Sequence, residues 1–333
     1  MRTRALLPLC AALLFAFATA AYAQEKPPFQ PSGPSRGPSV KDRPLERVSE
    51  RVWIIQAPEA FPTPGNQGLM ANLTFVDTEK GLVVVDTGSS EQIGEMAIGQ
   101  IRAGLKKPVV AIVNTHHHGD HWLGNGAFAA AYPGVPIYAH PGAMAAIRGA
   151  PGEQWRANME KVTGGATAGT RVVPPSESVE NGSVLRFGDT TLRMHHYGKA
   201  HTPHDIVVEV VEDGVTVVGD VAMDRRIANM EDGSYLGTLA TYDALEANTK
   251  TRTWLPAHGR PGPDVLRWNR ELFEGIYRVC EQAVKDGKSI EEAKELVLKD
   301  PRVAARAADT AGFKENIGKY VSLAFLEAEA AGF

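Results

Sequence analysis

The feature that most constrains this chain is a histidine-rich run, residues 115–121, which reads THHHGDH. Its H-x-H-x-D-H spacing places His116, His118, Asp120 and His121 close together in the sequence. Imidazole nitrogens and carboxylate oxygens both bind zinc and related transition metals. Protonated histidines would repel one another in such a run, whereas a bound metal requires them neutral. The run therefore predicts a metal site. His116 and His118 can reach one ion, and Asp120 and His121 can turn toward a second.

The N-terminus predicts a secretory signal peptide over residues 1–23. Arg2 and Arg4 give a positive start, an almost wholly apolar run follows over residues 5–18, and Ala-Tyr-Ala at 21–23 is a small-x-small cleavage pattern. The apolar run is shorter than the about 20 residues that a membrane-spanning helix needs, which disfavours an anchor. We expect cleavage after Ala23 and export, in a bacterium to the periplasm.

Composition excludes several other classes of protein. Cleavage would leave Cys280 as the one cysteine, so no intramolecular disulfide is expected despite an oxidising compartment. The net charge of −4 becomes −6 when Arg2 and Arg4 are lost, and no long basic run is present. Nucleic acids and anionic membranes are therefore disfavoured as partners, which leaves a small-molecule substrate. The sequence leaves the oligomeric state open.

Residues 24–45 form a leader rich in proline, glycine and serine, without apolar periodicity. We interpret it as a disordered tether before the folded domain, although it could instead be an arm that packs on a partner.

Beyond residue 45 the pattern alternates strands and helices, as expected of one large α/β domain. A strand at 109–114 (VVAIVN) is continuously apolar, as when both faces of a sheet are covered, and the histidine run follows at its C-terminal end. One helix is expected near 153–162, and the chain is mainly helical from residue 264, with a capping box at 289–292. Further strands are expected at 51–56, 72–77, 81–86, 135–139, 183–187, 190–197, 205–211, 215–218 and 254–257.

Three later residues are placed like the histidine run relative to a strand, since each lies at or near a strand end. They are His201 in a turn before a strand, Asp220 after Val218-Gly219, and His258 after Pro256-Ala257. Each residue alone would be weak evidence for a metal site, because an aspartate in such a place is commonly a turn residue and a histidine is commonly a core or surface group. With the first motif they complete a set of seven candidate ligands. His195 or His196 could replace His201 in that set, and His140, which ends a strand at the same edge, is expected to support a ligand from behind.

In these motifs the chain resembles the metallo-β-lactamase superfamily. The shared signatures are Asp86-Thr87-Gly88, the H-x-H-x-D-H run, Ala200-His201-Thr202-Pro203, Gly219-Asp220 and Pro256-Ala257-His258-Gly259, in the family's order. The resemblance implies an α/β fold, a four-layer αβ/βα sandwich over residues 46–262, with C-terminal helices at 263–333 packed on the same domain. The metals would lie at one edge of the sandwich.

The resemblance also implies the role of each ligand. His116, His118 and His201 would bind one metal, Asp120, His121 and His258 the other, and Asp220 would bridge both. Asp86 would orient the loop and a ligand histidine.

Zinc ions in such a pair share a water and lower its pKa, which creates a bridging hydroxide as nucleophile. Asp120 can orient that hydroxide and is the expected catalytic residue. The predicted reaction is hydrolysis of an ester, thioester, lactone or amide-type bond, with two Zn²⁺ per chain.

Alternatives remain at this level. Some β-lactam-degrading branches carry a cysteine near the position of Asp220, whereas the bridging aspartate resembles thioesterase and lactonase members. β-Lactam hydrolysis as the main activity stays open. So do a mononuclear iron persulfide dioxygenase, since imidazole also suits iron, and a metal-binding protein without turnover.

A narrower resemblance is to exported members of the family linked to sulfur oxidation or quinoprotein systems. It rests on Arg225-Arg226, Asp232-Gly233-Ser234, Leu239 and a tail with Asn316-Ile317, Tyr320 and Glu327. Arg225 and Arg226 could bind an acidic substrate or could be surface residues. In residues 58–70, a loop expected over the metal edge, Phe61 and Met70 are candidate substrate contacts. Trp155 and Met159, four apart, could line the groove or join the core, and we favour the core.

Overall fold

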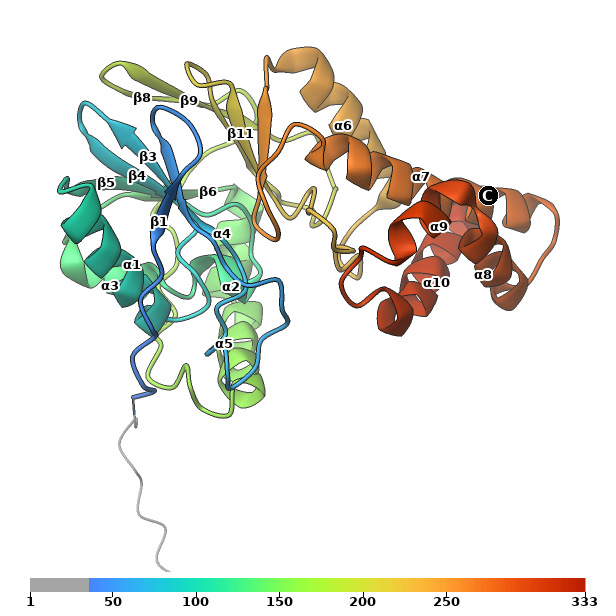
Figure 1. Cartoon of the computed structure of the whole chain (residues 1–333), viewed down its shortest axis with the longest axis horizontal. Helices are drawn as coiled ribbons and strands as arrows, with labels where there is room; N and C mark the ends of the chain where they lie inside the picture. The colour runs from blue at the N-terminus through green and yellow to red at the C-terminus, as the bar shows by residue number, and fades with distance from the viewer. Residues whose placement is uncertain (1–35, 333) are drawn as a thin grey trace, which may run out of the picture. The chain divides into compact units, whose positions relative to one another are not determined.

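The computed structural model of the protein describes residues 36–332 (Figure 1). The expected signal peptide and most of the proline-rich leader therefore lie outside the described residues. Among the helices of residues 36–332, none is both long enough and apolar enough to cross a membrane.

The first half of the chain builds a seven-stranded sheet in the order β1-β2-β3-β4-β5-β6-β7. Strands β1 to β4 pair antiparallel, and β4 to β7 pair parallel because helices cross between them. The strands are β1 Leu45–Arg47, β2 Val52–Ile55, β3 Leu73–Thr78, β4 Gly81–Val85, β5 Val109–Val113, β6 Ile137–Ala139 and β7 Glu177–Ser178.

The second half builds a five-stranded sheet in the order β12-β11-β10-β9-β8. Its strands β8 to β11 form an antiparallel meander, and β12 returns parallel to β11 after a helix. The strands are β8 Val184–Phe187, β9 Thr190–His195, β10 Val207–Val210, β11 Val215–Gly219 and β12 Thr253–Pro256.

The alternation of side chains along the strands shows that the two sheets face each other. On β4, Val83 and Val85 pack in one apolar cluster with residues of β9 to β12, whereas Leu82 and Val84 pack in another with helices α1 and α3. On the far side, the second sheet packs against α6 and α7. The layers are therefore helix, sheet, sheet, helix, and the predicted four-layer sandwich is confirmed (Figure 1).

The helices begin at recognisable caps. Ser90, Ser234 and Ser289 each accept a hydrogen bond from a backbone N–H in the first turn, and Ser289 forms the predicted capping box with Glu292. The helices are α1 Glu91–Gly104, α2 Gly119–Trp122, α3 Asn125–Ala131, α4 Pro141–Arg148, α5 Ala150–Val162, α6 Tyr235–Asn248, α7 Val265–Lys285, α8 Ile290–Lys299, α9 Pro301–Ala307 and α10 Phe313–Ala331.

The C-terminal helices form a group of their own beside the second sheet. α7 packs against α6 on one side and against α8, α9 and α10 on the other. α10 also reaches back to the sandwich, because Glu327 accepts hydrogen bonds from Ser234 Oγ at 2.7 Å and Tyr235 N at 2.7 Å. The carboxylate caps α6 and fixes the segment that precedes it.

Three local expectations differ from the structure. The described part of the leader, residues 36–44, has no helix or strand but does not hang free: Gly37 N donates to Ala168 O at 2.9 Å, and Gln67 Nε2 donates to Pro38 O at 3.2 Å. Residues 141–175 were expected to hold one helix, near 153–162. They hold two, α4 and α5, because Pro141 and Pro151 start separate helices. α6 was not expected, since its apolar residues face nearly all round and give no stripe.

Candidate metal centre

The candidate ligands gather at one edge of the sandwich because the strands that carry them end there. His116 and His118 follow β5, and Asp120 and His121 lie in the first turn of α2 directly after them. The other three come from the second sheet: His201 between β9 and β10, Asp220 after β11, and His258 after β12. β5 is an interior strand of the first sheet, and β11 and β12 are neighbours in the second, so loops far apart in sequence meet at this edge.

The local backbone at Asp220 depends on the glycine before it. Gly219 has φ of +54°, and a Cβ there would lie 3.1 Å from the side chain of Thr115. A left-handed residue in so small a space favours glycine. The turn aims Asp220 across the gap between the sheets toward His121 and His258.

Seven side chains form two adjoining groups. The first contains His116, His118, His201 and Asp220, and the second contains Asp120, His121 and His258; within each group the ligand atoms lie within 4.8 Å of one another. All seven are buried, with exposed fractions of 5% or less. The structure thus brings together every residue that the sequence proposed as a metal ligand.

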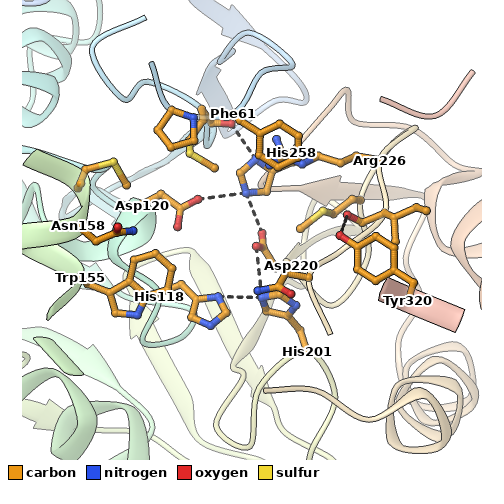
Figure 2. Close-up of a pocket in the computed structure, with 16 residues that line it drawn as sticks. Phe61, His118, Asp120, Trp155, Asn158, His201, Asp220, Arg226, His258 and Tyr320 are labelled. Carbon is orange, nitrogen blue, oxygen red and sulfur yellow. Dashed lines mark hydrogen bonds and ion pairs between the residues drawn. The ribbon is translucent and has the colours of Figure 1, made fainter. Parts of the chain in front are cut away.

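Asp220 lies between the two groups. Its Oδ2 is 3.5 Å from His201 Nε2 on one side and 3.5 Å from His121 Nε2 on the other, and its Oδ1 is 3.4 Å from His258 Nε2. Asp120 Oδ2 lies 3.2 Å from His258 Nε2 and 3.4 Å from His121 Nε2. Figure 2 shows Asp220 and His258 in the middle of the centre.

Most of the histidines are held from behind by a hydrogen bond from the ring nitrogen that faces away from the centre. His121 Nδ1 donates to Asp86 Oδ2 at 2.8 Å, and His258 Nδ1 donates to Met70 O at 2.8 Å. His116 Nδ1 donates to Thr115 Oγ1 at 3.1 Å. Such bonds fix the tautomer and leave the other nitrogen free to bind a metal.

Asp86 is the organising residue behind the centre. Besides the bond from His121, it accepts from Thr115 N and Thr115 Oγ1, each at 2.8 Å. Its backbone is left-handed, with φ of +61°, a strained conformation for a residue with a Cβ. The strain turns the carboxylate from the end of β4 under the histidine run.

Burial and charge give the groups the protonation states that suit a metal. Burial lowers the pKa of His116 well below its ordinary value and lowers the pKa of His201 to about 3, so both rings are neutral at neutral pH. For Asp120 and Asp220, burial alone would raise the pKa, but the neighbouring histidines outweigh it and hold each pKa well below the usual range. Asp120 and Asp220 in turn raise the pKa of His121 and His258, so without a metal these carboxylates are balanced by positive charge on the two rings beside them. A bound cation could supply that charge instead.

The hydrogen-bonding capacity of this centre is not satisfied by protein alone. His116 Nε2, His121 Nε2 and Asp220 Oδ1 are fully buried and have no hydrogen-bond partner among the described residues. Buried polar atoms without partners are rare, because each costs free energy. Nitrogen and oxygen atoms that converge in this way fit a bound cation.

A pocket opens onto the centre. It has a volume of about 190 Å³ and is lined by Asp120, Asp220, His118, His201 and His258 on one side. Figure 2 shows Trp155 and Asn158 across the centre from Arg226 and Tyr320. The remaining lining is mostly apolar and consists of Phe61, Pro62, Met70, Met159, Met223, Ile227 and Asn229.

Several sequence-based assignments of single residues are corrected here. His140 does not support a ligand: its Nδ1 caps α4 by accepting from Gly142 N at 3.1 Å, and its ring stacks on His204. Arg225 lies outside the pocket, exposed and beside Asp224, whereas Arg226 lines it. Trp155 is only partly buried: it packs against the apolar cluster that contains Met159 and also forms a wall of the pocket, with its ring 4.9 Å from that of His118. Met159 is buried as expected and also reaches the pocket.

Other expectations agree with the geometry. Phe61 and Met70 line the pocket, as expected from a loop over the metal edge. His195 pairs with Glu209 at 3.0 Å and His196 bonds to Asp205 O at 2.9 Å, so neither takes the place of His201.

Two residues at the site belong to the narrower resemblance, but the sequence assigned neither of them a role there. Asp232 lies far along the chain, yet its Oδ2 accepts from His118 Nε2 at 3.1 Å. Tyr320 reaches the pocket from α10 in the C-terminal helices. An aspartate in a loop and a tyrosine on a helix are common, and only the folded chain shows what they contact.

A sequence profile of the metallo-beta-lactamase superfamily matches residues 66–279. The chain belongs to this superfamily. The match spans all seven candidate ligands and Asp86, and ends within α7, so the last helices lie beyond it. Members of the superfamily are metal-dependent hydrolases, and the enzyme described here is of that class.

Individual relatives are distant. A type 2 metallo-beta-lactamase of Bacillus sp. (strain 170) is 23% identical over 223 residues, which cover 66% of this chain and 77% of that protein. A hydroxyacylglutathione hydrolase of Gloeobacter violaceus is 40% identical over 74 residues, which cover 21% of this chain and 27% of that protein.

Solved structures share the fold. A metallo-beta-lactamase from Pontibacter korlensis superposes with a TM-score of 0.56 at 20% identity and covers 69% of this chain and 98% of its own. The metallo-beta-lactamase FIM-1 of Pseudomonas aeruginosa, solved in its mono-zinc form, superposes with a TM-score of 0.56 at 17% identity. The superposition covers 71% of this chain and 97% of FIM-1.

Proposed function

We propose that this enzyme is an exported hydrolase that uses two zinc ions to cleave an ester, thioester, lactone or amide-type bond in a small molecule. His116, His118 and His201 would hold one ion, and Asp120, His121 and His258 the other, with Asp220 shared. The observation that carries the proposal is the pair of adjoining buried ligand groups with Asp220 within 3.5 Å of histidines in both.

The ligand chemistry supports zinc. The set contains imidazoles and carboxylates without a thiolate, and no cysteine of the described chain is near it, since Cys280 is buried in α7. Such nitrogen and oxygen ligands suit zinc, and they also suit iron. When bound, the ions would supply Lewis acidity that lowers the pKa of a water and polarises the scissile bond.

Asp120 is the residue best placed to handle the water proton. Its Oδ2 lies 3.2 Å from His258 Nε2, and the residue lines the pocket. The neighbouring histidines keep its pKa well below the usual range, so it is an ionised acceptor at neutral pH. It can therefore orient an attacking water by accepting a hydrogen bond from it.

The pocket favours a small substrate with an apolar part. Its volume of about 190 Å³ is below the roughly 300–1,000 Å³ of typical ligand pockets. Trp155, Met159 and Phe61 provide apolar walls on different sides. Water would be displaced from these surfaces when an acyl group binds, which favours binding.

β-Lactam hydrolysis is a second candidate, because two of the relatives, from Bacillus sp. and Bacillus cereus, are type 2 metallo-beta-lactamases. Thioester hydrolysis is supported by the match to a hydroxyacylglutathione hydrolase over 74 residues. Export rests on the sequence pattern of residues 1–23 alone.

The proposal is tested on protein that begins at Gln24, loaded with zinc and assayed against activated esters, thioesters, lactones and β-lactams. We expect turnover of at least one acyl class that is lost with a chelator and restored by zinc. Asp220→Asn should abolish it, whereas Asp243→Asn, at an exposed ion pair on α6, should not. Turnover confined to β-lactams would favour the second candidate, and turnover insensitive to chelator would contradict both.

A further inference from the structure

Arg226 is the only lysine or arginine among the residues that line the pocket of the described chain. Its exposed fraction is 7%. Its guanidinium carbon lies 4.3 Å from the centre of the Phe61 ring, and its Nη1 donates to Ala60 O at 3.3 Å. Within residues 36–332, no carboxylate lies within 4.0 Å of it.

A buried guanidinium without a carboxylate is unusual. Removal of a charge from water is unfavourable unless a partner compensates, and buried arginines are normally paired. Phe61 offers its aromatic face and Ala60 one carbonyl, which leave most of the guanidinium N–H groups without an acceptor. The planar array of donors matches a carboxylate, which can accept two parallel bonds.

The position of Arg226 is fixed by the C-terminal helices. Arg226 forms a parallel bridge with Ala311, and Ala311 N donates to Arg225 O at 2.9 Å. Tyr320 Oη donates to Ile227 O at 3.4 Å from α10. The segment that carries Arg226 is thus clamped by a part of the chain beyond the family match, and its side chain is held at the pocket.

The neighbouring arginine has the opposite orientation. Arg225 has φ of +54°, and its side chain is 59% exposed beside Asp224. The left-handed backbone at Arg225 sends two consecutive arginines to different environments. Arg225 therefore serves as a natural control for Arg226.

The charges of the pocket indicate which kind of group Arg226 would bind. The other charged groups in its lining are Asp120 and Asp220, which are committed to the metal centre in the proposed function. The unmatched charge is positive and lies on the same side as Tyr320, across the centre from Trp155 (Figure 2). A substrate with an anionic group on that side of the pocket would neutralise the charge of Arg226.

We propose that Arg226 binds a carboxylate group of the substrate, and that the enzyme acts on small acyl compounds that carry a carboxylate away from the scissile bond. This inference rests on the proposed hydrolase function. Phe61 packs against the guanidinium and orients it, and the apolar wall formed by Met223 and Ile227 accommodates the carbon chain between the two ends.

A structural role predicts something different. Arg226 also ties the loop at residues 57–70 to the pocket through Ala60 and Phe61. If that were its whole function, loss of the side chain would disturb charged and neutral substrates alike. The test must therefore compare substrates that differ only in charge.

The experiment uses the zinc-loaded enzyme and two esters, the 4-nitrophenyl monoester of adipic acid and the methyl ester of that compound, which is neutral. We expect wild type to favour the anionic ester in kcat/KM. Arg226→Met, which keeps the apolar stem, should lower kcat/KM for the anionic ester about 10- to 100-fold, mainly through KM, and change the neutral ester little. Arg226→Lys should retain part of the preference, and Arg225→Met all of it.

Binding gives a second readout that does not depend on turnover. Calorimetry compares adipamate with the neutral adipamide on the same zinc-loaded proteins. We expect adipamate to bind about 10-fold or more tightly than adipamide to wild type, and this preference to disappear in Arg226→Met. Thermal melting confirms that each variant is folded.

The outcomes separate the two proposals. Equal losses on both esters, or no charge preference in wild type, would overturn the carboxylate site while leaving hydrolysis in place. Charge-selective binding without turnover of either ester would support the carboxylate site and count against ester hydrolysis. A preference that survives in Arg226→Met would also overturn the inference, because the anion would then bind elsewhere.

Discussion

Asp86 holds the ring of His121 from behind: its Oδ2 accepts a hydrogen bond from His121 Nδ1 at 2.8 Å, while His121 Nε2 faces Asp120 and Asp220. The same carboxylate accepts two bonds from Thr115, which precedes the histidine run. One residue at the end of β4 thus orients both a ligand and the segment that carries His116, His118 and Asp120.

Asp86→Ala should therefore weaken metal binding although Asp86 is not itself a ligand. Loss of a carboxylate behind a metal-binding histidine typically costs about 10- to 100-fold in affinity. Competition with a zinc-chelating dye measures the change, and Asp243→Ala, an exposed acid on α6, is the control. Equal affinities for zinc in the two variants would show that Asp86 does not orient the ligand.

Asp232 makes a similar contact with His118, but its side chain is 51% exposed. Water screens an exposed partner, so we expect Asp232→Asn to reduce zinc affinity by no more than about 10-fold. Glu231→Gln is a matched control, because Glu231 is the adjacent acid and pairs with Lys319 at 2.6 Å. An effect of Asp232→Asn as large as that of Asp86→Ala would contradict this ranking.

The histidines outside the centre predict a loss of stability in acid. Burial, followed by the charges of His196 and His204, lowers the pKa of His140 to about 4. The folded state therefore binds a proton less readily than the unfolded chain, whose histidine pKa is about 6.5. The stabilisation is complete above about pH 6.5 and is lost as the pH falls toward 4.

His140→Asn should remove part of this dependence, because asparagine can still cap α4 but does not titrate. After a discount for the partial exposure of the ring, we expect the variant to lose about 1 kcal/mol less stability than wild type between pH 7 and pH 5. Urea unfolding at both pH values measures it. If the stability of the two proteins fell equally between pH 7 and pH 5, His140 and its neighbours His196 and His204 would not be the cause of the loss in acid.

Glu327 predicts how strongly α10 supports the segment near the pocket. Its carboxylate accepts bonds from Ser234 Oγ, Tyr235 N and Leu236 N at 2.7, 2.7 and 3.1 Å. Glu327→Gln keeps the shape but loses the charge at the start of α6, and should lower the free energy of unfolding by about 1–2 kcal/mol. Denaturant unfolding tests this. The control is the partly exposed Glu329, which makes no ion pair or side-chain hydrogen bond within residues 36–332, and Glu329→Gln is expected to change stability by less than about 0.5 kcal/mol.

The α/β character and the ligand edge could be predicted from the sequence because they depend on short-range patterns, whereas the four-layer sandwich followed from the resemblance to the superfamily. Apolar strands such as 109–113 and the ligand motifs at their ends are visible in one line of sequence. α6 escaped prediction because its apolar residues do not form a stripe. The contacts of Asp232, Tyr320 and Arg226 join segments distant in sequence, and only the fold brings them to the site.

His140 and Trp155 show the limits of position along a strand or helix as a guide. His140 does end a strand at the ligand edge, but its ring turns back to cap α4. Trp155 and Met159 do share a helix face, yet that face meets the pocket rather than the interior alone. Which way a side chain points depends on the neighbours that the fold supplies.

If the buried histidine and aspartate groups form a two-metal centre, the purified protein should contain two metal ions per chain. Protein that begins at Gln24 is purified from an exporting host without chelator or a histidine tag, and its metals are counted by mass spectrometry. We expect about two zinc ions per chain, a lower zinc content in Asp220→Ala and an unchanged zinc content in Asp243→Ala. One iron per chain, or no bound metal in active protein, would contradict the two-metal centre.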